Sequence, residues 1–318
     1  MNVKKIAIVG GSGFVGSVIA NRLSAQGAEV TILTRSRETA KHLWPLPNAN
    51  VIETDVFDPK QLRAVLSETH AVINLVGILN ERKDDGVGFR RAHVDLTQEI
   101  LNACKQNNVR RYLHMSALNA DPFATSYYLR TKGEAEKCVL TAGDNGLDTT
   151  IFRPSLIFGR NDGLFNRFHQ LLKISPVLPL ACARTRFQPV YVGDVADAFI
   201  AALEHKTTTG RKYDLGGPEV LSLREIVEYT NELCDLNRII IALGPKLSKL
   251  QARVCEYIPG KPFSLDNLRS ASEDSVIMHD NGLHELGISP TSFRSVVPNY
   301  LLGDMRARYN GLRGDAHR

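Results

Sequence analysis

The chain has 318 residues, of which 43% are hydrophobic and 23% are charged, and its formal net charge is +5. This composition is typical of a globular protein with a large core, in one large domain or two interleaved ones. No run of Lys and Arg with interleaved aromatic residues is present, which argues against nucleic-acid binding. The mild positive charge favours anionic ligands in a general way.

Cysteine spacing and apolar runs indicate the compartment. The five cysteines are scattered, without a CxxC pair or zinc spacing, which fits reduced thiols and predicts no metal site. The apolar run at 71–79 is far shorter than the roughly 18 residues that a membrane span needs. We therefore expect a cytoplasmic protein. The basic end of the chain, residues 306–318, is expected to fray, and contact with a membrane surface or a partner is the alternative.

Short apolar runs alternate with helical patterns through the first half of the chain. The runs are β-rich and nearly all apolar, as in strands covered on both faces. They lie at 6–10, 29–34, 50–55, 71–77, 111–117 and 149–155. Helical patterns lie between them at 14–26, 59–67, 92–106 and 127–142. This alternation predicts an α/β protein with a Rossmann-type, doubly wound parallel sheet.

The regular alternation of strand and helix patterns ends at residue 155. Residues 158–190 are rich in Gly, Pro and Arg and predict loops around a helix. Asp194 is expected to be the N-cap of the next helix. A strand, a turn and a helix are predicted further on, and the spacing of Ser222 and Glu225 is that of a capping box.

These patterns predict two functional parts. Residues 1–155, with return segments near 188–216, are expected to form the NAD(P)-binding Rossmann domain. Residues 156–318 are expected to form mainly a smaller α+β lobe that binds substrate, followed by the C-terminal tail.

A glycine-rich turn follows the first predicted strand and opens the first predicted helix. Gly10, Gly13 and Gly16 form a GxxGxxG pattern, and Phe14 and Val15 lie inside it. Small residues let main-chain N–H groups approach a pyrophosphate, and the helix N-terminus adds partial positive charge. The alternative is a tight turn without a ligand. The place of the motif at the head of a repeated strand–helix pattern favours dinucleotide binding.

The end of the second predicted strand bears on cofactor choice. An NAD site usually has a carboxylate here, whereas this chain has Thr34 followed by Arg35. A guanidinium binds a 2′-phosphate, so the sequence favours NADP(H), with NAD(H) as the alternative. Arg35 as a plain surface charge is the other interpretation. Asp55 and Val56 follow the third predicted strand where an adenine would lie; for Asp55, a loop carboxylate or cap is nearly as well supported.

The predicted helix at 127–142 carries Tyr128 and Lys132 four residues apart, on one helical face. An ammonium beside a phenol stabilises the phenolate and lowers the pKa of the tyrosine from about 10. Tyr128 is therefore a candidate proton donor or acceptor, and Lys132 is a candidate ligand of the nicotinamide ribose. The alternative is a Tyr–Lys contact on an exposed helix face.

These motifs together resemble a known superfamily. GxxGxxG, "NLVG", YxxxK, "RPSLIFG" and "FQPVYVGDVADAF" are similar to the extended or atypical short-chain dehydrogenases/reductases, the NAD-dependent epimerase/dehydratase-like group. "HVDLT", "RYLHMSALNAD", "YLRTKGEAE" and "PFSLDNLRS" resemble the branch with the short-chain-dehydrogenase-like accessory subunit of respiratory complex I and its bacterial relatives. The resemblance covers about residues 3–290. It implies a cofactor site made by Gly10, Gly13, Gly16, Arg35, Asp55, Asn74, Gly77, Tyr128, Lys132 and the stretch from Pro154 to Gly159.

One position departs from the superfamily pattern. The catalytic hydroxyl usually comes from a Ser or Thr at the end of the fifth strand, and Ala117 stands at the matching place. Ser116 is one residue earlier and points to the opposite face unless the strand has already ended. Ser116 is a catalytic candidate. Asn119 is a candidate substitute donor, and a role as a polar loop residue is the alternative.

Three further polar residues are candidate substrate ligands. Arg184, Arg186 and Gln188 precede the segment that turns toward the substrate in similar proteins. They are suited to an anionic or quinone-like group, and solvent-facing loop charge is the equal alternative.

Two functions from different classes remain open. The first is an NAD(P)-dependent oxidoreductase or epimerase-like enzyme that acts on an unidentified small molecule by hydride transfer, with Tyr128 as acid/base. The second is a non-catalytic NADPH-binding accessory or assembly subunit of a complex I-type NADH dehydrogenase, peripheral at the inner membrane. The Tyr–Lys pair supports the first, and Ala117 supports the second. The oligomeric state and the substrate have no readable signature.

Overall fold

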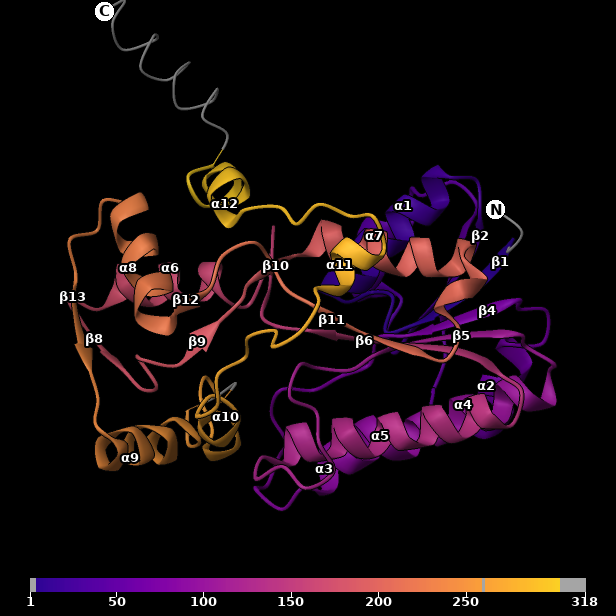
Figure 1. The fold of residues 1–318 in the computed structure, drawn as a ribbon, viewed down its shortest axis with the longest axis horizontal. Coiled ribbons are helices and arrows are strands. Elements are labelled where there is room, and N and C mark those ends of the chain that lie inside the picture. The colour runs from indigo at the N-terminus through magenta and orange to yellow at the C-terminus, as the bar shows by residue number, and fades with distance from the viewer. Residues whose placement is uncertain (1–3, 259–260, 304–318) are drawn as a thin grey trace, which may run out of the picture.

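The computed structural model describes residues 4–258 and 261–303 (Figure 1). The basic tail that we expected to fray lies outside the described residues. A seven-stranded parallel sheet fills one part of the molecule, with helices on both faces, and a smaller lobe lies at the other end.

The central sheet confirms the predicted doubly wound fold. Its strand order is β11-β6-β5-β4-β1-β2-β3, with β1 paired to both β2 and β4, so the chain reverses direction across the sheet at β1. The strands are β1 (Lys5–Val9), β2 (Glu29–Thr34), β3 (Ala49–Glu53), β4 (Ala71–Asn74), β5 (Arg111–Met115), β6 (Asp148–Pro154) and β11 (Arg211–Leu215). In such a sheet the crevice outside the carboxyl ends of the strands is the usual place for a ligand.

Two helical layers cover the sheet (Figure 1). Alternate strand residues serve the two faces: Ile6 and Ile8 pack in the core with α1 and α7, whereas Ala7 and Val9 pack with α2, α4 and α5. The helices are α1 (Phe14–Ala25), α7 (Val192–Glu204), α2 (Pro59–Val65), α4 (Leu96–Gln106) and α5 (Tyr127–Asp144). Short 3₁₀ helices span Glu38–Leu43 and Lys206–Thr208, and α11 (Gly282–Glu285) packs beside β11.

Two local predictions differ from the structure. The helix predicted at 92–106 starts earlier, because α3 (Val87–Arg90) and a π-helical stretch (Arg91–Asp95) lead directly into α4. The N-cap of α7 is Tyr191, so the assignment of Asp194 as N-cap was wrong. Asp194 lies in the first turn, where its carboxylate accepts hydrogen bonds from the N–H and hydroxyl of Thr291.

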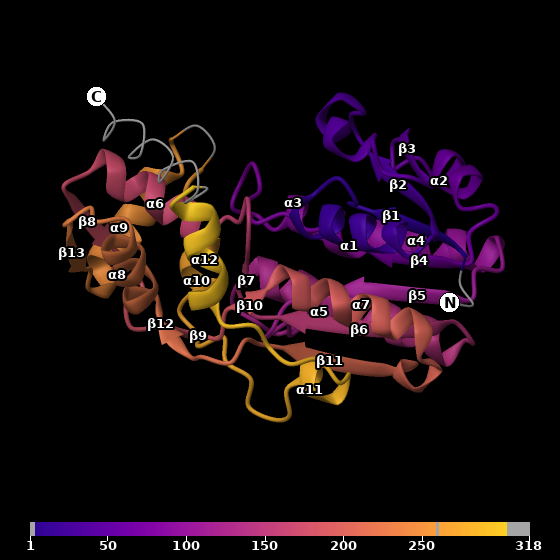
Figure 2. The same cartoon turned by 90° about the horizontal axis from the view of Figure 1, so that it is seen from above.

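The smaller lobe combines short strand pairs with helices (Figure 2). Its strands are β7 (Ile157–Phe158) with β10 (Val190–Tyr191), β8 (Val177–Leu180) with β13 (Ile239–Ala242), and β9 (Arg186–Phe187) with β12 (Leu221–Ser222). Its helices are α6 (Phe165–Ile174), α8 (Leu223–Leu233), α9 (Pro245–Cys255), α10 (Leu265–Ser270) and α12 (Phe293–Leu301). The capping box of Ser222 and Glu225 starts α8, as predicted. The lobe has its own apolar clusters, around Phe165 and around Leu172.

Candidate functional site

The glycine turn joins β1 to α1 at the carboxyl edge of the sheet. Gly13 is the N-cap of α1, and no side chain caps this helix. The first turn also contains no acidic residue. The N–H groups of Phe14 and Val15 are therefore left for an anion, and the helix dipole favours negative charge there.

The glycines of this turn serve different purposes. A Cβ at Gly16 would lie 2.5 Å from Cα of Gly11, so this glycine is required for close packing of the helix on the turn. Gly10 has a φ of +82°, which favours glycine. A Cβ at Gly13 meets only the carbonyl oxygen of Gly10, at 3.3 Å. Packing therefore restricts Gly13 less than it restricts Gly16.

Two arginines, Arg35 and Arg37, follow the end of β2. Arg35 is exposed and has no ion-pair partner in residues 4–258 and 261–303. The guanidinium of the neighbouring Arg37 lies over the ring of Trp44, 5.4 Å from its centroid. The main-chain N–H of Arg37 donates to the carboxylate of Glu53. Thr34 is buried, and its hydroxyl accepts a hydrogen bond from Ser12 over 3.2 Å. Of the two arginines, Arg35 is therefore the one available to a ligand.

The loops after β3 and β4 complete this edge. Asp55 is exposed, and one of its carboxylate oxygens accepts the N–H of Phe57 over 3.0 Å, while Val56 is buried. Asn74 is buried, and its amide is used entirely within the protein. It donates to Thr97 and Tyr112, and its oxygen accepts the N–H of Val76. Asn74 thus shapes the loop that leads to Gly77 and presents no free side-chain group to a ligand.

Tyr128 lies in an aromatic pocket at the start of α5. Its ring meets those of His93 and Phe89 edge-on, at centroid distances of 5.6 and 6.2 Å. Its hydroxyl has no hydrogen-bond partner within the described part of the chain. Burial raises the pKa of Tyr128 to about 12. The phenol is therefore protonated at neutral pH.

The ammonium of Lys132 is directed to main-chain carbonyl groups near the ends of β4 and β5 and not to Tyr128. Its ammonium donates to the carbonyl oxygens of Val76 and Met115 over 3.2 and 3.0 Å. The ideal Cβ position at Gly77 lies 3.2 Å from this nitrogen. Burial lowers the pKa of Lys132 to about 8. The expected lowering of the pKa of Tyr128 by Lys132 is absent, because the ammonium is directed to main-chain carbonyls and burial dominates at the phenol.

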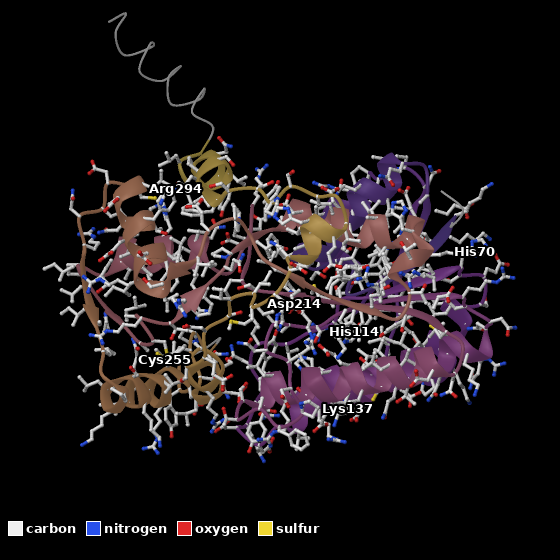
Figure 3. All side chains as sticks on the ribbon, viewed as in Figure 1. His70, His114, Lys137, Asp214, Cys255 and Arg294 are labelled. Atoms are coloured by element: carbon white, nitrogen blue, oxygen red, sulfur yellow. The ribbon has the colours of Figure 1, made fainter. Side chains whose placement is uncertain are left out.

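Two buried histidines accompany this pair, and sequence reasoning did not assign them to the site. His93 hydrogen-bonds the hydroxyl of Thr131 over 2.8 Å, and its Nε2 accepts the N–H of Ile78. Burial and the nearby Lys132 lower the pKa of His93 to about 2, so the ring is neutral. His114 lies between the sheet and α5 (Figure 3), and its Nε2 has no partner within the described part of the chain. "HVDLT" was noted only as part of a resemblance, and no spacing rule links His93 to Tyr128.

The hydroxyl of Ser116 lies buried just after the end of β5. The strand ends at Met115, and the N–H of Ser116 donates to the carbonyl of Phe152 over 2.7 Å. Its hydroxyl is buried without a hydrogen-bond partner in residues 4–258 and 261–303. Ala117 beside it is buried and offers no donor. Pro154, also buried, ends the neighbouring strand β6.

A carboxylate from the smaller lobe positions the start of α5. Asp266 is buried and accepts the N–H groups of Tyr127 and Tyr128 over 2.7 and 3.0 Å. It also accepts the hydroxyl of Ser126, which is the N-cap of α5. Sequence reasoning missed Asp266, because the residue lies about 140 positions beyond the helix that it contacts. The motif "PFSLDNLRS" contained it without a stated role.

Most of the residues expected to contact substrate form hydrogen bonds or ion pairs within the protein. Asn119 donates to the carbonyl of Asp274, and Arg186 forms an ion pair with the carboxylate of the same residue at 2.8 Å. Gln188 bonds the main chain of Gly217 and Ile277. The fourth candidate, Arg184, is exposed, with no ion pair in the described ranges. Asn119 and Arg186 thus brace the segment around Asp274 and are not free to bind a ligand.

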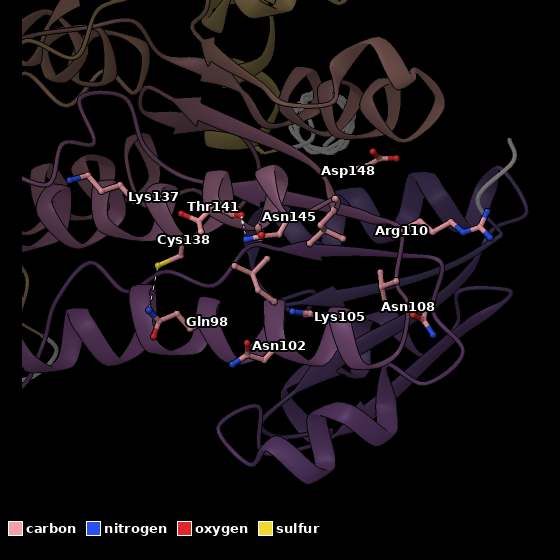
Figure 4. Close-up of a pocket in the computed structure, with 15 residues that line it drawn as sticks. Gln98, Asn102, Lys105, Asn108, Arg110, Lys137, Cys138, Thr141, Asn145 and Asp148 are labelled. Atoms are coloured by element: carbon pink, nitrogen blue, oxygen red, sulfur yellow. Dashed lines mark hydrogen bonds between the residues drawn. The ribbon is translucent and has the colours of Figure 1, made fainter.

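One recess of the described structure lies away from these residues. It has a volume of about 1100 Å³, lies between the outer sides of α4 and α5, and includes Gln98, Lys105 and Cys138 (Figure 4). None of the residues predicted to bind cofactor lines it. Volume alone therefore does not mark the candidate site.

The fold and this edge of the sheet define a class of protein: a dinucleotide-binding α/β protein with the Tyr–Lys helix of a short-chain dehydrogenase. The chain belongs to the NAD dependent epimerase/dehydratase family, whose model matches residues 6–216. The predicted resemblance is thereby confirmed.

Relatives of this chain include both respiratory subunits and reductases. It is 28% identical over 313 residues to the mitochondrial NADH dehydrogenase (ubiquinone) 1 alpha subcomplex subunit 9 of Arabidopsis thaliana. This alignment covers 93% of this chain and 76% of that protein. It is 25% identical over 282 residues to the 2-alkyl-3-oxoalkanoate reductase of Stenotrophomonas maltophilia, in an alignment that covers 80% of this chain and 83% of that protein. Among solved structures, MoeE5 in complex with UDP-glucose and NAD has a TM-score of 0.74 at 18% identity, over 95% of this chain and 99% of that one, which shows the shared fold.

No helix in residues 4–258 and 261–303 has both the length and the apolar character needed to cross a membrane.

Proposed function

We propose that this protein is an NADP(H)-dependent oxidoreductase that acts on a small carbonyl compound, with Tyr128 as the proton donor. The observation that carries the proposal is the state of Tyr128. It is a phenol whose hydroxyl has no hydrogen-bond partner in residues 4–258 and 261–303, on the same helix as Lys132, whose ammonium lies 3.2 Å from the ideal Cβ position at Gly77. A phenol that is protonated at neutral pH suits donation to a carbonyl oxygen, so reduction is the favoured direction.

The residues at the carboxyl edge of the sheet fit a dinucleotide. Gly10, Gly13 and the first N–H groups of α1 would hold the pyrophosphate, and Arg35 would hold a 2′-phosphate. Asp55 and Val56 would flank the adenine. Near the chemistry, Gly77 and Pro154 would border the nicotinamide end. The nicotinamide supplies the hydride when it is bound.

Two side chains near the carboxyl ends of β4 and β5 have roles in this scheme. Lys132 would hold the nicotinamide ribose, because its ammonium already lies at the carbonyls of Val76 and Met115. Ser116 would donate a hydrogen bond to the substrate carbonyl in place of the absent hydroxyl at Ala117, since its own hydroxyl is buried and unpaired in the described structure. Arg184 is the remaining free candidate for an anionic group of the substrate.

A second candidate function is that of a non-catalytic NADPH-binding accessory subunit of a complex I-type NADH dehydrogenase, peripheral at the inner membrane. The match to a subunit of that kind over 93% of this chain favours it. In this case the cofactor stabilises the fold, and the two parts, 1–155 with 188–216 and the remainder, act as a nucleotide-binding body and an attachment lobe.

One experiment separates the two functions. NADPH oxidation is measured against a panel of aldehydes, ketones and quinones with the wild type and with Tyr128→Phe. Turnover by the wild type that the variant lacks supports the enzyme. NADPH binding without turnover, together with co-purification of the tagged chain with a membrane NADH dehydrogenase, supports the accessory subunit.

A further inference from the structure

Helix α9 (Pro245–Cys255) presents its apolar side to the outside of the molecule. Leu247, Leu250 and Val254 follow one another at helical spacing, and 56%, 57% and 55% of their surfaces are exposed. The side that packs on the lobe carries Ser248 and Ala252 instead. A surface helix of a globular protein normally has the reverse arrangement, with its apolar stripe inward. The apolar stripe of α9 therefore has no use in the described packing.

A row of cations lies beside the apolar stripe. Lys246, Lys249 and Arg253 are exposed and share one side of α9, next to the leucines. None of the three forms an ion pair with any residue that the structure describes. Residues 236–255 contain no Asp or Glu. The helix thus carries positive charge that the protein does not neutralise locally.

The neighbouring strand pair also carries exposed apolar side chains. On β13, Ile239 and Ile241 are 61% and 49% exposed, and the partner of Ile239 on β8 is the exposed Val177. Gln251 of α9 donates to the carbonyl of Pro179 on β8 over 2.8 Å, which places the helix against the end of this strand pair. Figures 1 and 2 both show α9, β8 and β13 at the end of the molecule farthest from the seven-stranded sheet.

We propose that this end of the lobe, formed by α9 and the outer sides of β8 and β13, docks on an anionic lipid bilayer. An apolar stripe bordered by Lys and Arg is the pattern of a helix that lies in the membrane interface. Tyr257, which is 90% exposed directly after α9, adds an aromatic side chain of the kind that favours this depth. The leucines enter the acyl boundary while the three cations meet lipid phosphates.

Charge favours lipid over a second copy of this chain. Two copies joined through this surface would bring together two unneutralised cationic rows, which repel each other. Anionic headgroups neutralise them, and each Lys or Arg near such a surface adds to binding. Apolar burial and cation–headgroup attraction together provide the two signals that stable peripheral attachment needs.

The test is sedimentation of the purified full chain with vesicles. One set contains phosphatidylcholine only, and the other contains equal parts of phosphatidylcholine and phosphatidylglycerol. We expect binding to the anionic vesicles that weakens as salt rises, and at least about tenfold weaker binding to the neutral ones. The measurement uses no cofactor or substrate, so its result is independent of the proposed oxidoreductase activity.

Two triple variants with matched controls locate the surface. Leu247→Gln with Leu250→Gln and Val254→Gln removes the stripe, and Lys246→Glu with Lys249→Glu and Arg253→Glu reverses the charges. The controls make the same types of change at exposed positions elsewhere: Phe123→Gln, Val220→Gln and Met278→Gln, and Lys105→Glu, Arg110→Glu and Lys137→Glu.

Both α9 variants should lose at least about tenfold in vesicle affinity, while both controls keep most of it. All are at exposed sites, so unchanged circular dichroism and thermal midpoints are expected and are checked first. Equal binding by the α9 variants and the wild type overturns the proposal. So does a wild type that ignores vesicles but self-associates in a manner that the stripe variant abolishes, which would assign the surface to a second copy.

Discussion

The carboxylate of Asp266 accepts the main-chain N–H of Tyr128 over 3.0 Å and that of Tyr127 over 2.7 Å. These bonds join α10 of the smaller lobe to the first turn of the helix that carries the candidate proton donor. A negative charge at this end also suits the dipole of α5. The smaller lobe therefore fixes the position of the main chain at Tyr128.

Asp266→Ala should reduce the free energy of unfolding by about 1–3 kcal/mol, because two partly buried N–H groups and the buried hydroxyl of Ser126 lose their acceptor. Urea unfolding measures this change. The matched control is Asp84→Ala, since Asp84 is the other carboxylate partner of Arg269 and forms no hydrogen bond with α5 in the described structure. It should cost less than about 1 kcal/mol, as expected for a partly exposed ion pair. Equal losses in the two variants would contradict the role given to Asp266.

Lys132 should give the protein a pH-dependent stability in the alkaline range. Burial lowers its pKa to about 8 in the folded state from 10.5 in an exposed lysine. Between these values the unfolded chain holds a proton that the folded chain has released. Stability from this group therefore rises with pH through that interval, by up to about 1.4 kcal/mol per unit, and is lost as pH falls through about 8.

Lys132→Met has no titrating group here, so it should lack this gain. The unfolding free energy of the wild type minus that of the variant should therefore increase from about pH 8 to about pH 10. Guanidinium unfolding at several pH values measures it. Lys137→Met, on the outer side of the same helix (Figure 3), is the control and should show a constant difference. A constant difference for Lys132→Met as well would show that its ammonium is not buried.

Local patterns were sufficient for the nucleotide-binding half of the fold. Strands covered on both faces appear as continuous apolar runs, and six strands of the sheet were therefore predicted. The glycine turn and the Ser222 capping box depend only on neighbours within a few residues, so the start of α8 was predicted as well. Contacts across long sequence separations were not predictable. Asp266 meets Tyr128, and Arg186 meets Asp274, through lobe packing that no spacing encodes. The protonation state of Tyr128 likewise depends on burial, which the motif alone does not contain.

Cofactor preference should depend on Arg35. Arg35→Glu should raise the dissociation constant for NADPH by about tenfold or more and leave that for NADH nearly unchanged, because only NADPH carries the 2′-phosphate. Titration of both nucleotides by fluorescence or calorimetry measures this. Arg37→Glu is the control, as the guanidinium of Arg37 already lies over Trp44. A wild type that binds both nucleotides equally would rule out the NADP(H) preference.

Substitutions at Gly13 and Gly16 should have different effects. Gly13→Val should disturb the fold less than a change at Gly16, because its Cβ would meet one carbonyl oxygen at 3.3 Å, but it places a branched side chain where the pyrophosphate would approach. Cofactor-dependent thermal stabilisation, about 2.7 kcal/mol at one hundred times the dissociation constant, should disappear. Gly16→Ala should instead destabilise the protein without cofactor, since its Cβ would lie 2.5 Å from Cα of Gly11. Full cofactor stabilisation in folded Gly13→Val would mean that the loop is only a tight turn.

The last prediction concerns the chemistry of Tyr128 and Ser116. Tyr128→Phe removes a hydroxyl with no hydrogen bond within the described residues, so stability should change by less than about 0.5 kcal/mol. NADPH affinity should stay nearly intact, while turnover of any carbonyl substrate falls by about 100- to 10,000-fold. Steady-state rates and NADPH titration on the same preparations separate these effects.

Ser116→Ala provides the companion test, because its buried hydroxyl lacks a protein partner in the described structure. Removal of an unpaired buried hydroxyl should leave stability unchanged or slightly raise it, yet turnover should fall if this hydroxyl polarises the substrate carbonyl. Ala117→Ser restores a hydroxyl at the position that the superfamily normally uses and should raise carbonyl reduction. If wild type and Ala117→Ser both bind NADPH but reduce nothing in a broad panel, the enzyme proposal fails. The accessory-subunit proposal then stands alone, with the Tyr–Lys pair retained only for packing and cofactor binding.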